Sequence, residues 1–152
     1  DNAIRRFPEW AAFGTRSTAH WFWGGQDVTN HYILEAVRGG FLTLVLFVTI
    51  ITLSYIAVGR TWRVWQADKP RLHMSWALGV CLFVHCTNFI GVSYFGQGVF
   101  IWYLHLAMIG SMYEWSRNVE LVRRRRTAAM RRPVGPRFEG GRWPSPSGGP
   151  LA

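Results

Sequence analysis

Residues 40–59 read GFLTLVLFVTIITLSYIAVG, and this stretch decides the fold because it contains no charged side chain. Its length matches the roughly 20 residues that an α-helix needs to cross about 30 Å of hydrocarbon. Its Thr and Ser hydroxyls can bond back to the helix backbone, so they do not exclude a membrane span. The sequence therefore predicts a transmembrane helix over 40–59.

The apolar region that follows is longer and predicts two more spans. Residues 72–112 hold no Asp, Glu, Lys or Arg. This run is too long for one helix and suits two of about 17–20 residues each. The sequence SYFGQG at 93–98 interrupts it with two Gly and a Gln. We expect spans at about 75–92 and 98–114, paired as an antiparallel hairpin, and an all-α polytopic membrane protein with three spans.

The positive charge is concentrated in two segments that predict the orientation. Of the net charge of +9, residues 113–152 contribute nine Arg against three Glu, which is +6. The loop at 60–74, RTWRVWQADKPRLHM, carries four basic residues and one acidic residue. Short basic loops stay in the cytoplasm. Residues 1–39 are therefore expected outside, with a short interfacial helix, followed by a three-helix region at 40–115 and a cytoplasmic tail at 116–152.

Composition narrows the class of protein. The chain is 49% hydrophobic but only 16% charged, whereas soluble domains average about 25% charged residues. No phosphate loop, HExxH, GxSxG or paired-Cys zinc pattern is present, so a soluble hydrolase or nucleotide-binding fold is not supported. The opening DNAIRRFPEW has no Met and no signal-peptide core. We expect a missing natural beginning.

The basic tail is expected to be disordered and to face lipid. From Pro133 it reads PVGPRFEGGRWPSPSGGPLA, which has too few apolar side chains to offset the entropy of ordering. The RRRR run at 123–126 adjoins apolar segments. An anionic membrane surface is therefore its expected partner, and no nucleic acid is expected.

Polar residues gather just before the first span, in DVTNHYILEAVRGG at 27–40. Asp27 or Thr29 can cap a helix, on which His31 shares a face with Glu35 and Arg38. Such a cluster could form an anion or proton-transfer site. It could equally mark where a span leaves the membrane, with the arginine anchored to headgroup phosphates.

Three polar residues lie inside the predicted hairpin: His85, Asn88 and His105. The first two share a helix side, and the two histidines are expected at similar depth on facing helices. Hydrogen bonding between helices is one reading. A bis-His haem or a metal, or a role along a substrate path, are the others.

The segment NHYILEAVRGGFLTLVLF at 30–47 resembles the O-antigen ligase and polymerase family of polytopic glycan-assembly proteins. In that family the last large periplasmic loop ends with a His-Asn, a Tyr-Leu pair, an acidic residue and glycines, and runs straight into an apolar span. Three spans and a cytoplasmic end follow it. The likeness covers most of residues 15–115, as the carboxyl-terminal part of a longer protein. The matching residues, with His and Asn in reverse order, are Asn30, His31, Tyr32, Leu34, Glu35, Gly39 and Gly40.

The resemblance implies glycosyl transfer in the bacterial inner membrane, with no metal or nucleotide cofactor. The donor would be a glycan on a polyprenyl diphosphate, and the acceptor a lipid or a growing glycan. Membrane lipids and the missing N-terminal helices of the same protein would be its other partners. The alternatives are a non-enzymatic integral membrane subunit and a haem-carrying electron-transfer subunit that uses His85 and His105.

The resemblance also assigns roles to the polar cluster. His31 would activate or orient the acceptor hydroxyl, and Glu35 and Asp27 would set its tautomer. The substrate-binding residues would include two arginines, whose planar guanidinium groups suit a diphosphate. These substrate-binding residues are Arg16, Arg38 and Asn30.

Overall fold

The protein is all-helical over the residues that its structure, a computed structural model, describes: 2–21 and 28–130. Two short helices, α1 (Asn2–Arg5) and α2 (Phe7–Trp10), and one 3-10 turn, η1 (Ala19–Trp21), come first. Three long helices follow: α3 (His31–Val64), α4 (Lys69–Gly91) and α5 (Gln97–Met130). The predicted all-α class is confirmed over this part of the chain.

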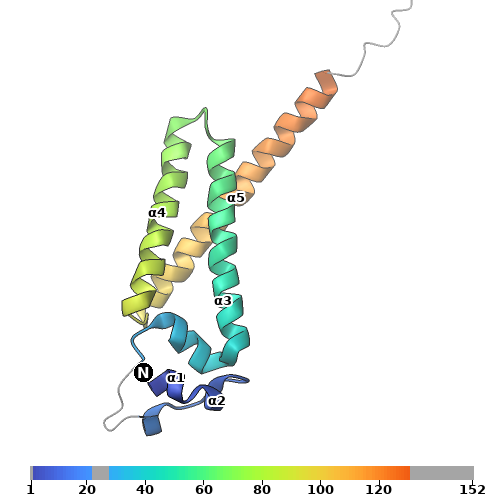
Figure 1. The fold of residues 1–152 in the computed structure, drawn as a ribbon. Coiled ribbons are helices and arrows are strands. Elements are labelled where there is room, and N and C mark those ends of the chain that lie inside the picture. Colours follow the sequence, from blue (N-terminus) through green and yellow to red (C-terminus); the bar gives the residue numbers. More distant parts are fainter. Residues whose placement is uncertain (1, 22–27, 131–152) are drawn as a thin grey trace, which may run out of the picture.

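The three long helices form an antiparallel bundle. In Figure 1, α3 and α4 run side by side, and α5 crosses them before its second half leaves the bundle. The carboxylate of Asp68 caps α4 by accepting from the backbone N–H of Arg71, and Pro70 lies in its first turn, where no backbone donor is lost. The hairpin turn falls at 92–96 and overlaps the interruption that the sequence predicts at 93–98.

A kink divides α3 into two parts. Gly40 has φ 78° and ψ −177°, a conformation that L side chains rarely adopt. Residues 31–39 therefore form a separate short segment that meets the apolar part of the helix at an angle (Figure 1). The predicted short helix before the first span exists, but it begins at His31. Its cap is Asn30, rather than Asp27 or Thr29.

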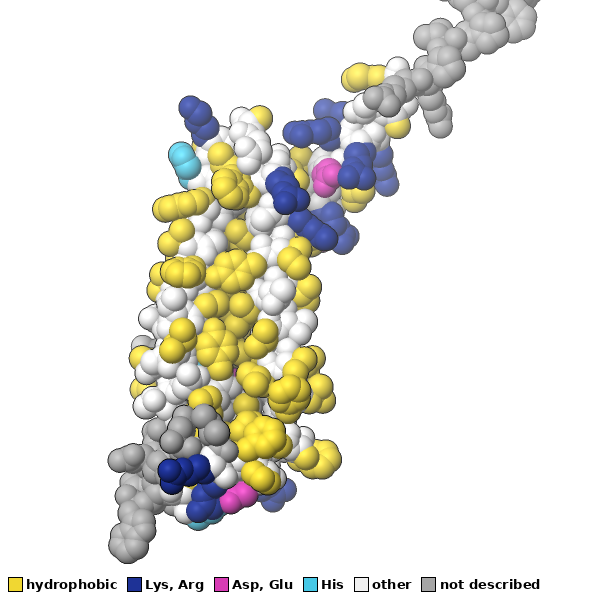
Figure 2. Space-filling model, viewed as in Figure 1, with side chains coloured by type: hydrophobic (Ala, Val, Ile, Leu, Met, Phe, Trp, Pro, Cys, Tyr) yellow, Lys and Arg dark blue, Asp and Glu magenta, His cyan; other side chains and the backbone are white. Residues whose placement is uncertain are grey.

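Apolar side chains both fill the bundle and cover its outside. The core joins all three helices through Phe47, Leu82, Phe89, Trp102 and Ile109. Figure 2 shows yellow side chains over the middle of the visible face and charged ones at its two ends. Only 11% of the most apolar stretch of α3 and 22% of that of α4 is buried, unlike the core helix of a soluble protein. This surface fits a membrane protein.

Two of the described helices, α3 and α4, are long and apolar enough to cross a membrane. The third predicted span is helical as well, within α5. Polar and charged residues lower the average hydropathy of α5, so the crossing of the membrane by this helix stays a prediction. The orientation of the three long helices in the membrane also stays a prediction.

The predicted disordered tail requires a correction. Residues 116–130 continue α5 as helix up to Met130, and only the residues after it lie outside the described ranges. The reason is local, because this stretch holds five Arg and two Ala, which favour helix. A pair at i,i+4 supports it, in which Arg124 lies 2.5 Å from the carboxylate of Glu120.

Candidate functional site

The predicted cluster lies at the end of the bundle where α3 is kinked, beside the hairpin turn between α4 and α5. His31, Glu35 and Arg38 share one side of the segment before the kink, as their spacing predicted. Nε2 of His31 lies 3.8 Å from Oε1 of Glu35, and the Arg38 guanidinium lies 3.9 Å from the same oxygen. The geometry therefore forms a row of three groups that runs from the core to the surface.

His31 is the buried end of this row. His31 is only 4% exposed, and its ring stacks on that of Phe89 with 4.7 Å between the ring centroids. The ring of Phe47 meets it edge-on, with 5.5 Å between centroids. The backbone N–H of Tyr94, in the hairpin turn, donates to Nδ1 of His31 over 3.1 Å. The side chain thus joins the start of α3 to the far end of α4.

These contacts determine what the imidazole can do chemically. A neutral His has one lone pair, and here Nδ1 uses it to accept from Tyr94. The proton therefore belongs on Nε2, which faces Glu35. His31 in this tautomer cannot also take a proton from an acceptor hydroxyl. The geometry favours an orienting role over a general-base role.

Asn30 is a structural residue in this arrangement. Its side-chain oxygen accepts from the backbone N–H of Ile33 over 3.2 Å and caps α3. Its amide nitrogen donates to the carbonyl of Ile90 over 3.1 Å, which ties α3 to the end of α4. Both ends of the amide are thus engaged, so the prediction that Asn30 binds substrate is not favoured.

Glu35 and Arg38 are the accessible end of the row. The Glu35 side chain is 26% exposed and the Arg38 side chain is 61% exposed. A pair about 4 Å apart with this exposure is weak, so the guanidinium remains available to an incoming anion. Arg38 is the member of the predicted cluster that is best placed to bind phosphate.

Arg16 reaches the same end of the molecule because the amino-terminal segment packs onto the kink. The backbone N–H of Thr15 donates to the carbonyl of Val37 over 2.7 Å, and that of Phe41 donates to Ala11 over 2.9 Å. Gly14, at φ 74°, lies so close that a Cβ there would overlap the carbonyl of Arg38. Arg16 is exposed and two residues away from this contact. Asp27 lies outside the described residues.

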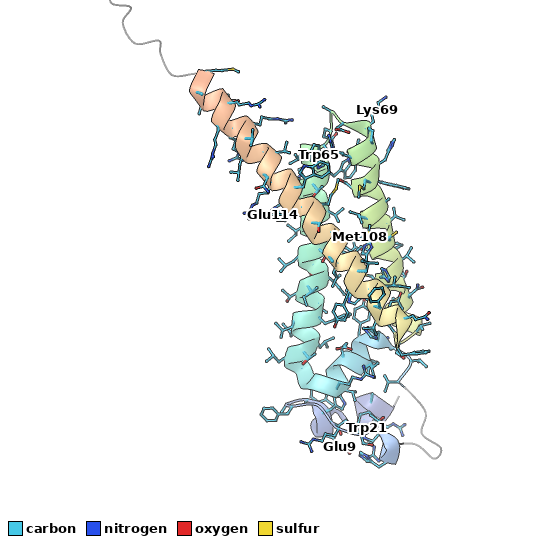
Figure 3. All side chains as sticks on the ribbon, turned by 180° about the vertical axis from the view of Figure 1, so that it is seen from behind. Glu9, Trp21, Trp65, Lys69, Met108 and Glu114 are labelled. Carbon is cyan, nitrogen blue, oxygen red and sulfur yellow. The ribbon has the colours of Figure 1, made fainter. Side chains whose placement is uncertain are left out.

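Glu9 organises the amino-terminal segment, although no local sequence pattern indicates this role. Its carboxylate accepts from Arg6 over 2.8 Å and from the indole of Trp21 over 3.0 Å, and it bonds the ring of His20 over 3.1 Å. Figure 3 labels Glu9 and Trp21 at this end of the molecule. The hydrogen bond from His20, followed by those from Trp21 and Arg6, lowers the pKa of Glu9 below its usual value. These partners are up to 12 residues away, so no motif marks them.

His85 and His105 face each other, as predicted, with 5.2 Å between ring centroids. Nδ1 of His85 bonds the hydroxyl of Tyr94 over 2.9 Å, and Trp102 packs against the same ring. Two imidazoles on one haem iron need centroids roughly 6 Å apart, given metal–nitrogen bonds of about 2 Å. The pair is too close for that, and the geometry favours packing between helices. No group of three or more His, Cys, Asp or Glu in the described ranges could hold a metal.

Tyr94 is the residue that sequence reasoning missed at this site. Its backbone N–H holds His31, its hydroxyl holds His85, and its ring lies 4.8 Å from that of Phe89. The interruption at 93–98 predicted a turn here but gave no reason to connect it with the polar cluster.

The chain matches no protein-family model, no curated protein and no solved structure.

Proposed function

We propose that the chain is the carboxyl-terminal membrane portion of a glycan ligase or polymerase. It would transfer a glycan from a polyprenyl diphosphate to a lipid or glycan acceptor. The observation that supports this best is the exposed Arg38 guanidinium beside the partly exposed Glu35 carboxylate. The pair lies in the segment that resembles the family, next to the apolar surface on which a polyprenyl chain would lie.

The arginines act on the donor. Arg38, with Arg16 from the packed amino-terminal segment, binds the diphosphate and stabilises the negative charge that grows on it as the glycosidic bond breaks. The planar guanidinium can donate two parallel hydrogen bonds to one phosphate group.

Glu35 acts on the acceptor. The acceptor hydroxyl oxygen forms a bond to the anomeric carbon, the bond from that carbon to the diphosphate oxygen breaks, and the hydroxyl proton passes to the Glu35 carboxylate. His31 is a positioning residue, because its Nε2–H faces Oε1 of Glu35 while Tyr94 holds the other ring nitrogen. The further helices of the same protein would complete the cavity around the substrates.

The proposed location is the bacterial inner membrane, with three spans. The kinked end of the bundle faces outward, and the end with the arginines of α5 faces the cytoplasm. The concentration of basic residues in the 60–74 loop and after 113 supports this orientation.

The experiment is glycan transfer from a labelled polyprenyl-diphosphate glycan, in membranes that contain the full-length protein. Arg38→Ala should lower kcat/KM on the order of a hundredfold or more, as expected for the loss of a charge-stabilising group. Arg38→Lys should restore part of it. Arg5→Ala is the matched control, an exposed arginine at the same end, and should leave transfer unchanged. Equal transfer by Arg38→Ala and the parent protein would remove the proposed site.

A second function, a non-enzymatic membrane subunit, is favoured by one observation. Both ends of the Asn30 amide, and the Nδ1 of His31, already make hydrogen bonds that hold the helices together. Under this reading Arg38→Ala and Glu35→Gln change no transfer activity, whereas His31→Ala only lowers stability. The same assay therefore separates the two functions.

A further inference from the structure

A groove of about 800 Å³ opens at the other end of the molecule, between the end of α3 and the second half of α5. Figure 2 shows dark-blue side chains gathered where α5 leaves the bundle, just beyond the yellow surface. Glu120 is the only acidic residue in the described lining. The arginines that line the groove are Arg60, Arg63, Arg117, Arg123 and Arg124.

Among the described residues, three of these positive charges have no carboxylate partner. Arg124 pairs with Glu120 at 2.5 Å, and Arg117 pairs with Glu114 at 3.2 Å. Arg60 instead donates to the hydroxyl of Tyr113 over 3.1 Å. Within the described ranges, Arg63 and Arg123 form no ion pair. Like charges that share one groove repel each other, and a bound anion removes that repulsion. Guanidinium groups bind phosphate well.

An apolar groove of about 350 Å³ continues from the basic one along the outside of the bundle. The two grooves share Arg60 and Tyr113. The apolar part runs between Leu53 of α3, which is 58% exposed, and Leu106 of α5. Gly110 keeps it open, since a Cβ added there would meet nothing within 4 Å. One continuous groove thus offers positive charge at its end and apolar surface along its length.

We propose that this groove binds one anionic phospholipid. The phosphate lies among Arg60, Arg63 and Arg123, and an acyl chain lies along the apolar part towards Leu53 and Gly110. Charge complementarity selects an anion, and the apolar continuation on the outer surface selects a lipid over a free anion or a nucleic acid. The lipid ties the diverging half of α5 to α3. The site is at the opposite end from the proposed transfer site and does not depend on it.

The charged half is tested by native mass spectrometry of the purified full chain in detergent, with phosphatidylglycerol or phosphatidylcholine added. The parent protein should retain one phosphatidylglycerol in preference to phosphatidylcholine. The triple variant Arg60→Gln, Arg63→Gln, Arg123→Gln should lower that affinity on the order of a hundredfold. The control Lys69→Gln, Arg125→Gln, Arg126→Gln removes three exposed charges from the same end and should change it less than about threefold. Equal losses in both triples, or equal retention of the two lipids, would overturn the proposal.

The apolar half is tested with Gly110→Phe, whose ring fills the groove while the open space around Gly110 accommodates it. The affinity of this variant for phosphatidylglycerol should fall at least tenfold, while its circular dichroism spectrum is unchanged. Unchanged lipid binding would contradict the proposed acyl path. Inorganic phosphate or a single-stranded oligonucleotide that displaces phosphatidylglycerol at equal concentration would show that the groove takes a free anion or nucleic acid, and would likewise overturn the proposal.

Discussion

The backbone N–H of Tyr94 donates to Nδ1 of His31 over 3.1 Å, across 63 residues of sequence. This contact fastens the first residue of α3 to the turn between α4 and α5. It also directs the remaining ring nitrogen to Glu35. By sequence alone His31 resembles an exposed member of a surface cluster, but these contacts place it in the core. It acts on the surface of the protein through the Glu35 carboxylate that it faces.

His31→Ala should destabilise the bundle by about 2–4 kcal/mol. The substitution leaves the Tyr94 N–H without its acceptor and opens a cavity against Phe89. Thermal unfolding in detergent, followed by circular dichroism, measures the change. The control is His73→Ala, which removes an exposed imidazole from α4 and should leave the midpoint unchanged. A midpoint for His31→Ala equal to that of the parent would mean that the ring contacts do not hold the helices together.

Gly14→Ala should release the amino-terminal segment from the kink of α3. The residue has φ 74°, and a Cβ would overlap the carbonyl of Arg38, so the cost is about 1–3 kcal/mol. Tryptic cleavage after Arg16 in the folded protein should become faster, on the order of tenfold, because it follows the population of the released segment. Gly59→Ala is the control, since a Cβ there meets nothing within 4 Å. Similar cleavage rates for the two variants would show that the close approach at Gly14 is unimportant.

Acid should loosen the same segment through Glu9. The pKa of this carboxyl is lowered in the folded protein, mainly by the hydrogen bond from His20. Its contribution to stability is therefore fully present above the unfolded value near 4.5 and is lost as the pH falls through the lower folded value. Hydrogen exchange of residues 2–21, corrected for the intrinsic pH effect, should rise below about pH 4.5. In Glu9→Gln this rise should disappear, and a rise of the same size in both proteins would assign it to another group.

Labelling with an impermeant thiol reagent in intact cells should distinguish the two ends of the bundle. In a chain with Cys81→Ala and Cys86→Ala, Thr29→Cys should be labelled at once, whereas Ala128→Cys should need permeabilised cells. The reason is that an odd number of spans, with the basic connectors inside, places these two exposed positions on opposite sides. Labelling of both positions in intact cells would mean that α5 does not cross the membrane, and the reversed pattern would invert the orientation.

The sequence alone determined the features that depend on residues close together along the chain, namely where the helices lie and where they are interrupted. An uncharged stretch of about 20 residues is helical in lipid because every backbone group must be satisfied within it. For that reason 40–59 lies inside α3, and all of 75–92 except its last residue lies inside α4. The Gly39–Gly40 pair and the 93–98 interruption fall at the kink and at the turn. The disordered tail was predicted from residue 116, but 116–130 are helical because local helix propensity and the Glu120–Arg124 pair continue α5.

Only the tertiary structure decided which polar groups remain available. The lone pair on Nδ1 of His31 accepts a hydrogen bond from Tyr94, and the ring is covered by Phe89. These two residues lie 63 and 58 positions away in the sequence. Arg60 and Arg123 share one groove although the chain separates them by a similar length. Spacing along a helix predicts which side chains share a face. The partners that bury a side chain, or leave it open, come from other helices, and the packing of those helices is a property of the whole bundle.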